Sequence, residues 1–80
     1  MLTDYIAAAL RRAHYEILPD GEGVYAEIRE LPGVWANGDT VEETREDLRL
    51  ALEGWIALAL ARGVPIPELD GVGIALTAVP

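Results

Sequence analysis

The sequence predicts an α+β domain in which a small sheet is covered by helix. Three features indicate this fold class. An apolar stripe with helical spacing runs through residues 40–62, two runs of β-favouring residues flank a turn at residues 19–23, and a further apolar run occupies residues 72–79. The predicted order is helix, three strands, long helix and strand, and the 80 residues make one domain, residues 1–80.

The first predicted element is a short amphipathic helix over residues 2–13. Thr3 or Asp4 is placed to cap its start. Arg11 and Arg12 fall in its last turn, where the negative end of the helix dipole favours cations. Its apolar face consists of Leu2, Tyr5, Ile6, Ala9, Leu10 and Ala13. This face either packs in the core, the reading we favour, or docks on a second subunit.

The predicted sheet is an antiparallel meander over residues 14–38. The first two strands form a hairpin around residues 19–23, which have strong turn chemistry. In the second strand, apolar positions alternate with positions that carry an aromatic ring and charges, so one face points at a core. The inward set is Val24, Ala26 and Ile28, and the outward set is Tyr25, Glu27 and Arg29.

The stretch Leu31-Pro32-Gly33 turns the chain between the second and third strands. Proline has no amide donor for a central strand, and glycine permits a sharp change of direction. Residues 34–37 are then predicted as a short third strand, which Gly38 and Asp39 end.

A long helix is predicted over residues 40–62. Thr40 is its N-cap, and Glu43 completes a capping box. Gly63 and Pro65 end the helix. Its expected inner stripe consists of Val41, Thr44, Leu48, Ala51, Leu52, Trp55, Ile56 and Ala59.

Apolar residues also lie outside this inner stripe, at Leu50, Ala57, Leu58 and Ala61. A helix that is wetted on one side does not normally carry such a surplus. The surplus predicts burial under the first helix, a subunit interface, or both, and we favour a homo-oligomer, a dimer or tetramer. The last predicted strand, residues 72–79, turns Val72, Ile74, Leu76 and Ala78 to one side.

The composition restricts the partners. The chain carries 14 acidic and 6 basic residues, a formal net charge of −8. Such a surface repels nucleic acid and suits a basic protein, although acidity can also serve solubility alone. The absence of cysteine excludes disulfides and thiolate metal sites. No apolar run approaches the roughly 20 residues that span a bilayer, and the start is a poor signal peptide, so we expect no membrane contact and a cytoplasmic protein.

The segment VYAEIRELPGVWANGDTVEETREDLRLALEGWI resembles the amino-terminal domain of HicB-family antitoxins. The shared pattern is an aromatic-led strand, a Leu-Pro-Gly turn, a short strand, Gly-Asp-Thr, and an acidic helix with an aromatic residue near its middle. The matching positions are Tyr25, Ala26, Glu30, Leu31, Pro32, Gly33, Gly38, Asp39, Thr40, Glu42, Glu43 and Trp55.

This resemblance implies a truncated RNase H-like fold, in which the last strand lies beside and parallel to the first. It also implies a function. HicB-like antitoxins bind a small basic HicA-like toxin that cleaves mRNA, and they inhibit it by occlusion. The partner-binding residues would then be Tyr25, Glu27, Glu30, Trp35 and Asp39, because large aromatics anchor interfaces and carboxylates attract cations. Trp35 fits equally well in the core between sheet and helix.

Catalysis is the less favoured alternative. An RNase H-type reaction needs several carboxylates around divalent metal ions, and no spacing singles out Glu16, Glu27 and Asp39. His14 is the only histidine and has no second nitrogen or sulfur ligand to form a zinc site. We therefore expect no catalytic residue, metal or cofactor. A homo-oligomeric structural or regulatory domain with no toxin partner is the main alternative to an antitoxin.

Overall fold

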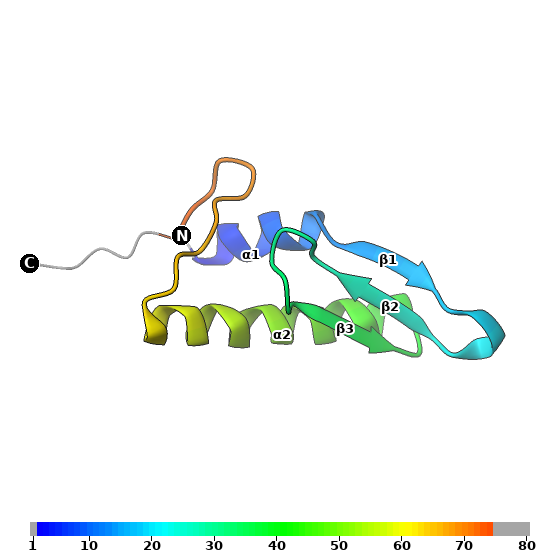
Figure 1. Cartoon of the computed structure of the whole chain (residues 1–80). Helices are drawn as coiled ribbons and strands as arrows, with labels where there is room; N and C mark the ends of the chain where they lie inside the picture. The colour runs from blue at the N-terminus through cyan, green and yellow to red at the C-terminus, as the bar shows by residue number, and fades with distance from the viewer. Residues whose placement is uncertain (1, 75–80) are drawn as a thin grey trace, which may run out of the picture.

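The computed structural model describes residues 2–74. Its elements are α1 (Leu2–Arg11), β1 (His14–Ile17), the 3-10 turn η1 (Pro19–Gly21), β2 (Val24–Glu27), β3 (Trp35–Gly38) and α2 (Val41–Arg62). The strands pair antiparallel in the order β1-β2-β3 (Figure 1). The α+β class, the three-stranded meander and the long helix are thus confirmed.

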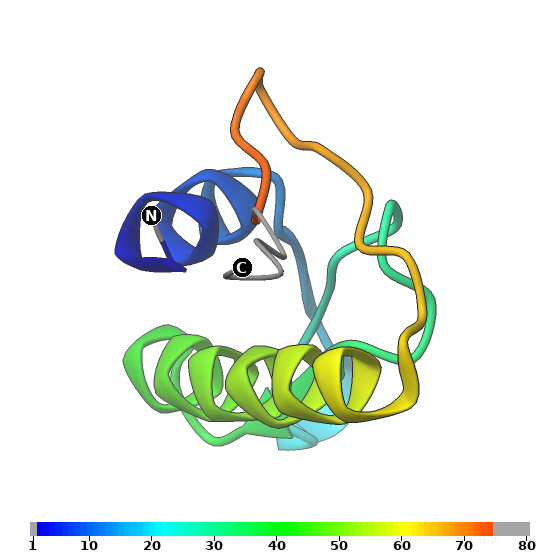
Figure 2. The same cartoon turned by 90° about the vertical axis from the view of Figure 1, so that its left-hand side faces the viewer.

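The molecule is elongated, 54 × 23 × 17 Å, and the sheet and α1 lie one after the other along α2 (Figure 1). α2 packs against β3 and β2, while its C-terminal part faces α1 (Figures 1 and 2). α1 and β1 follow one another along the same side of α2 (Figure 1). β1 is therefore left largely uncovered by helix.

The core lies between α2 and the layer formed by α1, the sheet and the loop before β3. Its buried members are Tyr5, Ala8, Ala9, Ala26, Ile28, Leu31, Val34, Ala36, Leu48, Leu52, Ile56 and Leu69. The predicted inward set of the second strand is confirmed, because Val24, Ala26 and Ile28 are all buried. Thr44 is buried as well, and its hydroxyl donates to the Thr40 carbonyl over 2.7 Å.

Three details of the helices differ from the prediction. Val41 is 43% exposed because it opens α2, ahead of the buried turns. α1 ends at Arg11, and the next two residues form tighter turns in which Arg12 N–H donates to Ala9. Leu2 is 47% exposed, and the buried residues of α1 are Tyr5, Ala8 and Ala9.

Both predicted ends of the long helix are confirmed. The Thr40 side chain accepts from the Glu43 N–H over 3.1 Å. Gly63 adopts a left-handed φ of 68°, and the Val64 N–H donates to the Ala59 carbonyl over 2.9 Å. This is the Schellman arrangement, which satisfies carbonyls at a helix end.

The third strand begins one residue later than predicted, because Val34 is drawn into the turn, where its N–H donates to Leu31. It continues through Gly38, which pairs with Val24. A Cβ at Gly38 would lie 3.0 Å from the Thr44 hydroxyl oxygen. Glycine therefore allows the end of β3 to approach the first turn of α2.

The predicted fourth strand, residues 72–79, lies mostly outside the described residues. In its described part, Val72 bridges Leu69 antiparallel and residues 73 and 74 are in no strand. The segment 64–74 leaves the end of α2 and crosses back to α1 (Figure 2). A fourth strand beside β1, and with it the RNase H-like topology, stays a prediction.

Candidate partner-binding surface

One face of the sheet points away from α2. Cross-strand pairing places His14, Glu27 and Trp35 in one row and Glu16, Tyr25 and Asn37 in the next. Because side chains alternate along a strand, these six residues share the face opposite the buried Val24, Ala26 and Ala36. We call this set the outer sheet face.

Trp35 lies on the outer sheet face and not in the core. It is 54% exposed and stacks on Tyr25, with ring centroids 6.2 Å apart and an interplanar angle of 27°. The two neighbours of Trp35 in the chain, Val34 and Ala36, are both buried, so alternation turns the indole outward. The structure thus decides between the two positions that the sequence left open.

Glu27 accepts hydrogen bonds from two neighbours on this face. Tyr25 donates its hydroxyl to Oε1 and Arg29 donates Nε–H to Oε2, each over 3.1 Å. The hydrogen bond from Arg29, and after it the one from Tyr25, lowers the pKa of Glu27. Loss of solvation, and then the bond to the carboxylate, raises the pKa of Tyr25. Glu27 is therefore ionised at neutral pH, with its orientation fixed by both neighbours.

An open hollow of about 260 Å³ lies between β1 and β2. It is lined by His14, Tyr15, Glu16, Tyr25, Glu27 and Arg29. Two carboxylates and an aromatic ring at one opening form a surface that suits a guanidinium or ammonium group, through charge pairing and contact with the ring.

The other two predicted partner residues lie elsewhere. Glu30 accepts from Arg12 Nη1 over 2.7 Å, and the same guanidinium donates through Nη2 to Asp70 over 2.6 Å. These bonds raise the pKa of Arg12, and the bond from Arg12 lowers the pKa of Glu30. Asp39 is exposed between β3 and α2. Of the five predicted residues, the structure brings Tyr25, Glu27 and Trp35 together.

The sequence interpretation did not place His14 and Glu16 beside Tyr25 and Glu27. The signal that could have found them is the hairpin itself. With its turn centred on residues 19–22, each residue of the first strand has a fixed partner in the second, and His14 then lies opposite Glu27.

A second exposed surface lies on α2. Leu50 and Leu58 are 52% and 50% exposed, and Ala57 and Ala61 are also exposed. Leu50, Ala57 and Ala61 recur at a spacing that keeps them on one side of the helix. All four residues are exposed, so their predicted burial under the first helix is wrong, and the predicted subunit interface stays a prediction.

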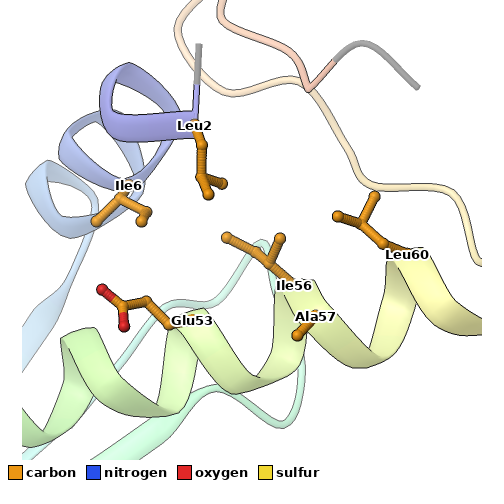
Figure 3. A pocket seen from close by; sticks show the side chains of 6 residues that line it. All are labelled: Leu2, Ile6, Glu53, Ile56, Ala57 and Leu60. Carbon is orange, nitrogen blue, oxygen red and sulfur yellow. The ribbon is translucent and has the colours of Figure 1, made fainter. Parts of the chain in front are cut away.

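Ala57 also belongs to a groove of about 390 Å³ between α1 and α2 (Figure 3). The groove is lined by Leu2, Ile6, Glu53, Ile56, Ala57 and Leu60. The Leu2 and Ile6 side chains point from α1 toward α2, and Glu53 lies at one end (Figure 3). The exposed apolar surface of α2 is thus continuous with this groove.

Neither a metal cluster nor a membrane span is found in the part of the chain that the structure describes. No three His, Asp or Glu side chains within residues 2–74 are grouped so that they could hold a metal ion. No helix within that range is both long and apolar enough to cross a bilayer.

A protein-family model, a protein sequence and a crystal structure each match this chain. The UPF0150-like family model matches residues 4–67. The UPF0150 protein ssl0259 of Synechocystis sp. is 38% identical over 55 residues, which cover 68% of this chain and 75% of that protein. The crystal structure of TTHA0281 from Thermus thermophilus superimposes with a TM-score of 0.87 at 45% identity, covering 94% of this chain and 93% of the other. This TM-score over nearly the whole chain supports the packing of the helices and the three-stranded sheet described above.

Proposed function

Because the chain belongs to the UPF0150-like family and carries an aromatic and acidic outer sheet face, we propose that it is an antitoxin-like inhibitor. Its partner in this proposal is a small basic HicA-like toxin that cleaves mRNA. The observation that supports this function best is the exposed Trp35–Tyr25 stack beside the oriented carboxylate of Glu27. Such a target places the inhibitor in the cytoplasm.

The chemistry of the surface fits a cation-rich protein. A protein that binds RNA needs lysine and arginine to contact phosphates. On the outer sheet face, Glu16 and Glu27 offer carboxylates to those cations, and Tyr25 offers a ring on which a guanidinium can stack. The net charge of −8 attracts such a partner and repels RNA itself.

Inhibition in this proposal is occlusion. The inhibitor covers the basic surface that the toxin uses for RNA, so no bond is made or broken. Trp35 supplies the large aromatic surface that dominates the energetics of many interfaces, while the carboxylates chiefly accelerate association.

The test is direct binding and rescue. A HicA-like toxin encoded beside this chain's gene is co-expressed with the chain, and growth and complex formation are measured. Trp35→Ala is expected to weaken binding by tenfold or more, since aromatic anchors contribute about 2 kcal/mol or more. Because Trp35 is 54% exposed, the melting temperature should change little.

Val41→Ala is the matched control, because Val41 is also a half-exposed apolar residue but opens α2. This control should leave binding unchanged. Tight binding that Trp35→Ala does not affect would exclude the outer sheet face as the contact, and the absence of any binding to such a toxin would reject the antitoxin function.

A homo-oligomeric structural or regulatory domain is the second candidate. It is favoured by the exposed Leu50 and Leu58, together with Ala57, which continues into the groove beside α1. The double substitution Leu50→Glu and Leu58→Glu should then abolish assembly in sedimentation experiments. If the assembly persists, these leucines are not its interface.

A further inference from the structure

Gly54 lies in the middle of α2, where nothing in the described part of the chain requires a glycine. It is not among the residues with positive φ, so its backbone conformation suits any residue. A Cβ at Gly54 would meet no atom within 4 Å. Glycine is the least favourable helix residue after proline, so Gly54 weakens α2 without a benefit inside the chain. The missing side chain has a use if another helix crosses α2 closely at this point.

The exposed residues around Gly54 form a stripe along α2. They recur at alternating spacings of three and four residues, which is the pattern of helices that pack in pairs. The stripe lies opposite the buried Leu48, Leu52 and Ile56. We call it the outer helix face. It consists of Asp47, Leu50, Gly54, Ala57 and Ala61, with the exposed Leu58 beside it.

No segment of residues 2–74 covers the outer helix face. α1 packs along a different side of α2, across the groove that Ile56 and Leu60 line (Figure 3). The segment 64–74 turns from the end of α2 toward α1, where Val72 and Ile74 pack against the core (Figure 2). Small residues dominate the face, so it offers shallow space into which the side chains of a second helix can fit.

The charges of α2 favour a second copy that runs in the opposite direction. The first half of the helix carries four acidic residues, Glu42, Glu43, Glu46 and Asp47. Arg49 is paired with Glu46 and Glu53, whereas neither Asp47 nor Arg62 forms an ion pair within the described residues. A parallel pair of helices would place each of these two charges beside its own copy. An antiparallel pair brings opposite charges together and opposes the two helix dipoles.

We propose that a second copy of this chain docks on the outer helix face, with its α2 antiparallel to the first and a twofold axis at Gly54. Leu50 of each copy then packs on the partner's Ala57 and Ala61. The glycine at the crossing lets the helix axes approach to about 8 Å, the short end of the usual range. The proposal rests on the homo-oligomeric candidate function, which it deepens. It does not depend on toxin binding, because the outer sheet face stays free.

The ion pairs fit this register. Asp47 and Arg62 lie about 10 and 12 Å along the helix axis from Gly54, in opposite directions. Both lie toward the flank of the face that carries Leu58, so antiparallel packing brings each guanidinium to the partner's carboxylate. Leu58 and Arg62 also line an open hollow of about 190 Å³, which the partner's α2 would partly cover. Each pair forms twice by symmetry, so the charge pattern of the face is self-complementary.

The first experiment measures the oligomeric state of the full chain by sedimentation over a wide concentration range. The unaltered chain should form a dimer that dissociates on dilution. Gly54→Gln should weaken the dimer about tenfold or more, because a side chain at the axis keeps the helices apart. The same variant should raise the melting temperature of the dilute monomer, because glutamine favours a helix more than glycine does. Ala7→Gln, the control, places this side chain on the exposed side of α1 and should leave the dimer unchanged.

Charge exchange tests the register. Arg62→Glu should weaken the dimer about tenfold, since both symmetric pairs become repulsive. Asp47→Arg combined with Arg62→Glu recreates the pairs in reverse and should restore most of the affinity. Arg45→Glu makes the same charge change on α2 but away from the outer helix face, and should have little effect. Circular dichroism checks that each variant folds.

Cysteine cross-linking tests the orientation, because the chain has no cysteine of its own. Two copies of the Gly54→Cys variant meet at the twofold axis and should form a disulfide under mild oxidation. Two copies of the Ala61→Cys variant place their cysteines about 20 Å apart in the antiparallel pair and should not cross-link. A parallel pair would instead bring the Ala61→Cys positions together.

Each contrary result overturns a defined part of the proposal. A monomer at every concentration rejects it together with the homo-oligomeric candidate, and leaves the antitoxin function to its own test. A dimer that Gly54→Gln does not weaken retains that candidate but places the interface elsewhere. Cross-linking of Ala61→Cys rejects the antiparallel orientation. Failure of the double charge variant to restore the dimer rejects the register at Gly54.

Discussion

At the scale of single residues, two glycines of the β1–β2 turn share a backbone conformation but differ in their surroundings. Gly21 and Gly23 have φ of 71° and 100°. A Cβ at Gly21 would meet nothing within 4 Å, whereas a Cβ at Gly23 would lie 2.4 Å from the Gly38 carbonyl oxygen. Gly23 therefore needs glycine for two reasons, its φ and the close approach of β3.

The expected outcome is a large difference between two similar substitutions. Gly21→Ala should lower the free energy of unfolding by about 1–2 kcal/mol, the usual cost of a left-handed alanine. Gly23→Ala should cost at least about 3 kcal/mol, because the carbonyl is backbone and cannot move away without disturbing the sheet. Urea denaturation measures both, and equal costs would show that the Gly38 contact is unimportant.

At the scale of elements, side chains of α1 hold the segment that follows α2. Tyr5 is fully buried and donates its hydroxyl to the Pro67 carbonyl over 2.7 Å. Tyr5→Phe should lower the free energy of unfolding by about 1 kcal/mol, because the Pro67 carbonyl loses its donor. Tyr25→Phe removes a hydrogen bond to Glu27, whose carboxylate still accepts from Arg29, and should cost less. Faster exchange of the Val72 amide in Tyr5→Phe alone would locate the loss in this segment.

Acid should loosen the loop before β3 through Glu30, which Arg12 connects to the end of α1. The hydrogen bond from Arg12 lowers the pKa of Glu30 below its ordinary value of 4.5. Because the pKa of Glu30 is lowered in the folded protein, the ion pair with Arg12 contributes fully to stability above the ordinary pKa. This contribution is lost as the pH falls through the pKa of the folded protein. The Leu31 amide donates to the Ile28 carbonyl beside Glu30, and its protection factor, relative to the intrinsic exchange rate at each pH, should therefore fall on acidification below about pH 4.5. Arg12→Gln should remove this step, and a step that persists in the variant would assign it to another carboxyl.

The elements differ in how far their sequence predicts them. Thr40 and Gly63 define the ends of α2 through local contacts, so capping and turn chemistry were enough to predict them. The attachment of α1 to the segment after α2 depends on Tyr5 and Pro67, 62 positions apart, which no local pattern connects. Trp35 had two possible positions, because a four-residue strand contains too few side chains to show which face is buried.

At the scale of the whole molecule, the two exposed surfaces lie on opposite sides. The outer sheet face points away from α2, and Leu50, Ala57 and Ala61 lie on the side of α2 turned away from its buried residues. A partner on the sheet and a second copy on the helix would therefore not compete. Glu30, predicted on the partner surface, instead connects α1 with the loop before β3, because Arg12 reaches it across a sequence separation of 18.

The net charge of −8 makes association with a basic toxin dependent on salt, and the effect should depend on where the charges lie. Glu27→Lys combined with Asp39→Lys reverses two carboxylates, one on β2 and one directly after β3. This variant should slow association by about tenfold at low salt and flatten the dependence of the rate on ionic strength. The rates are measured by stopped-flow mixing with a HicA-like toxin at several salt concentrations.

The control variant is Asp47→Lys combined with Glu68→Lys. It changes the net charge equally, but on α2 and on the segment that follows it, and it should slow association less. Equal slowing in both variants would show that net charge alone attracts the partner. An unchanged rate in the Glu27→Lys and Asp39→Lys variant would mean that the carboxylates near the sheet do not steer the partner.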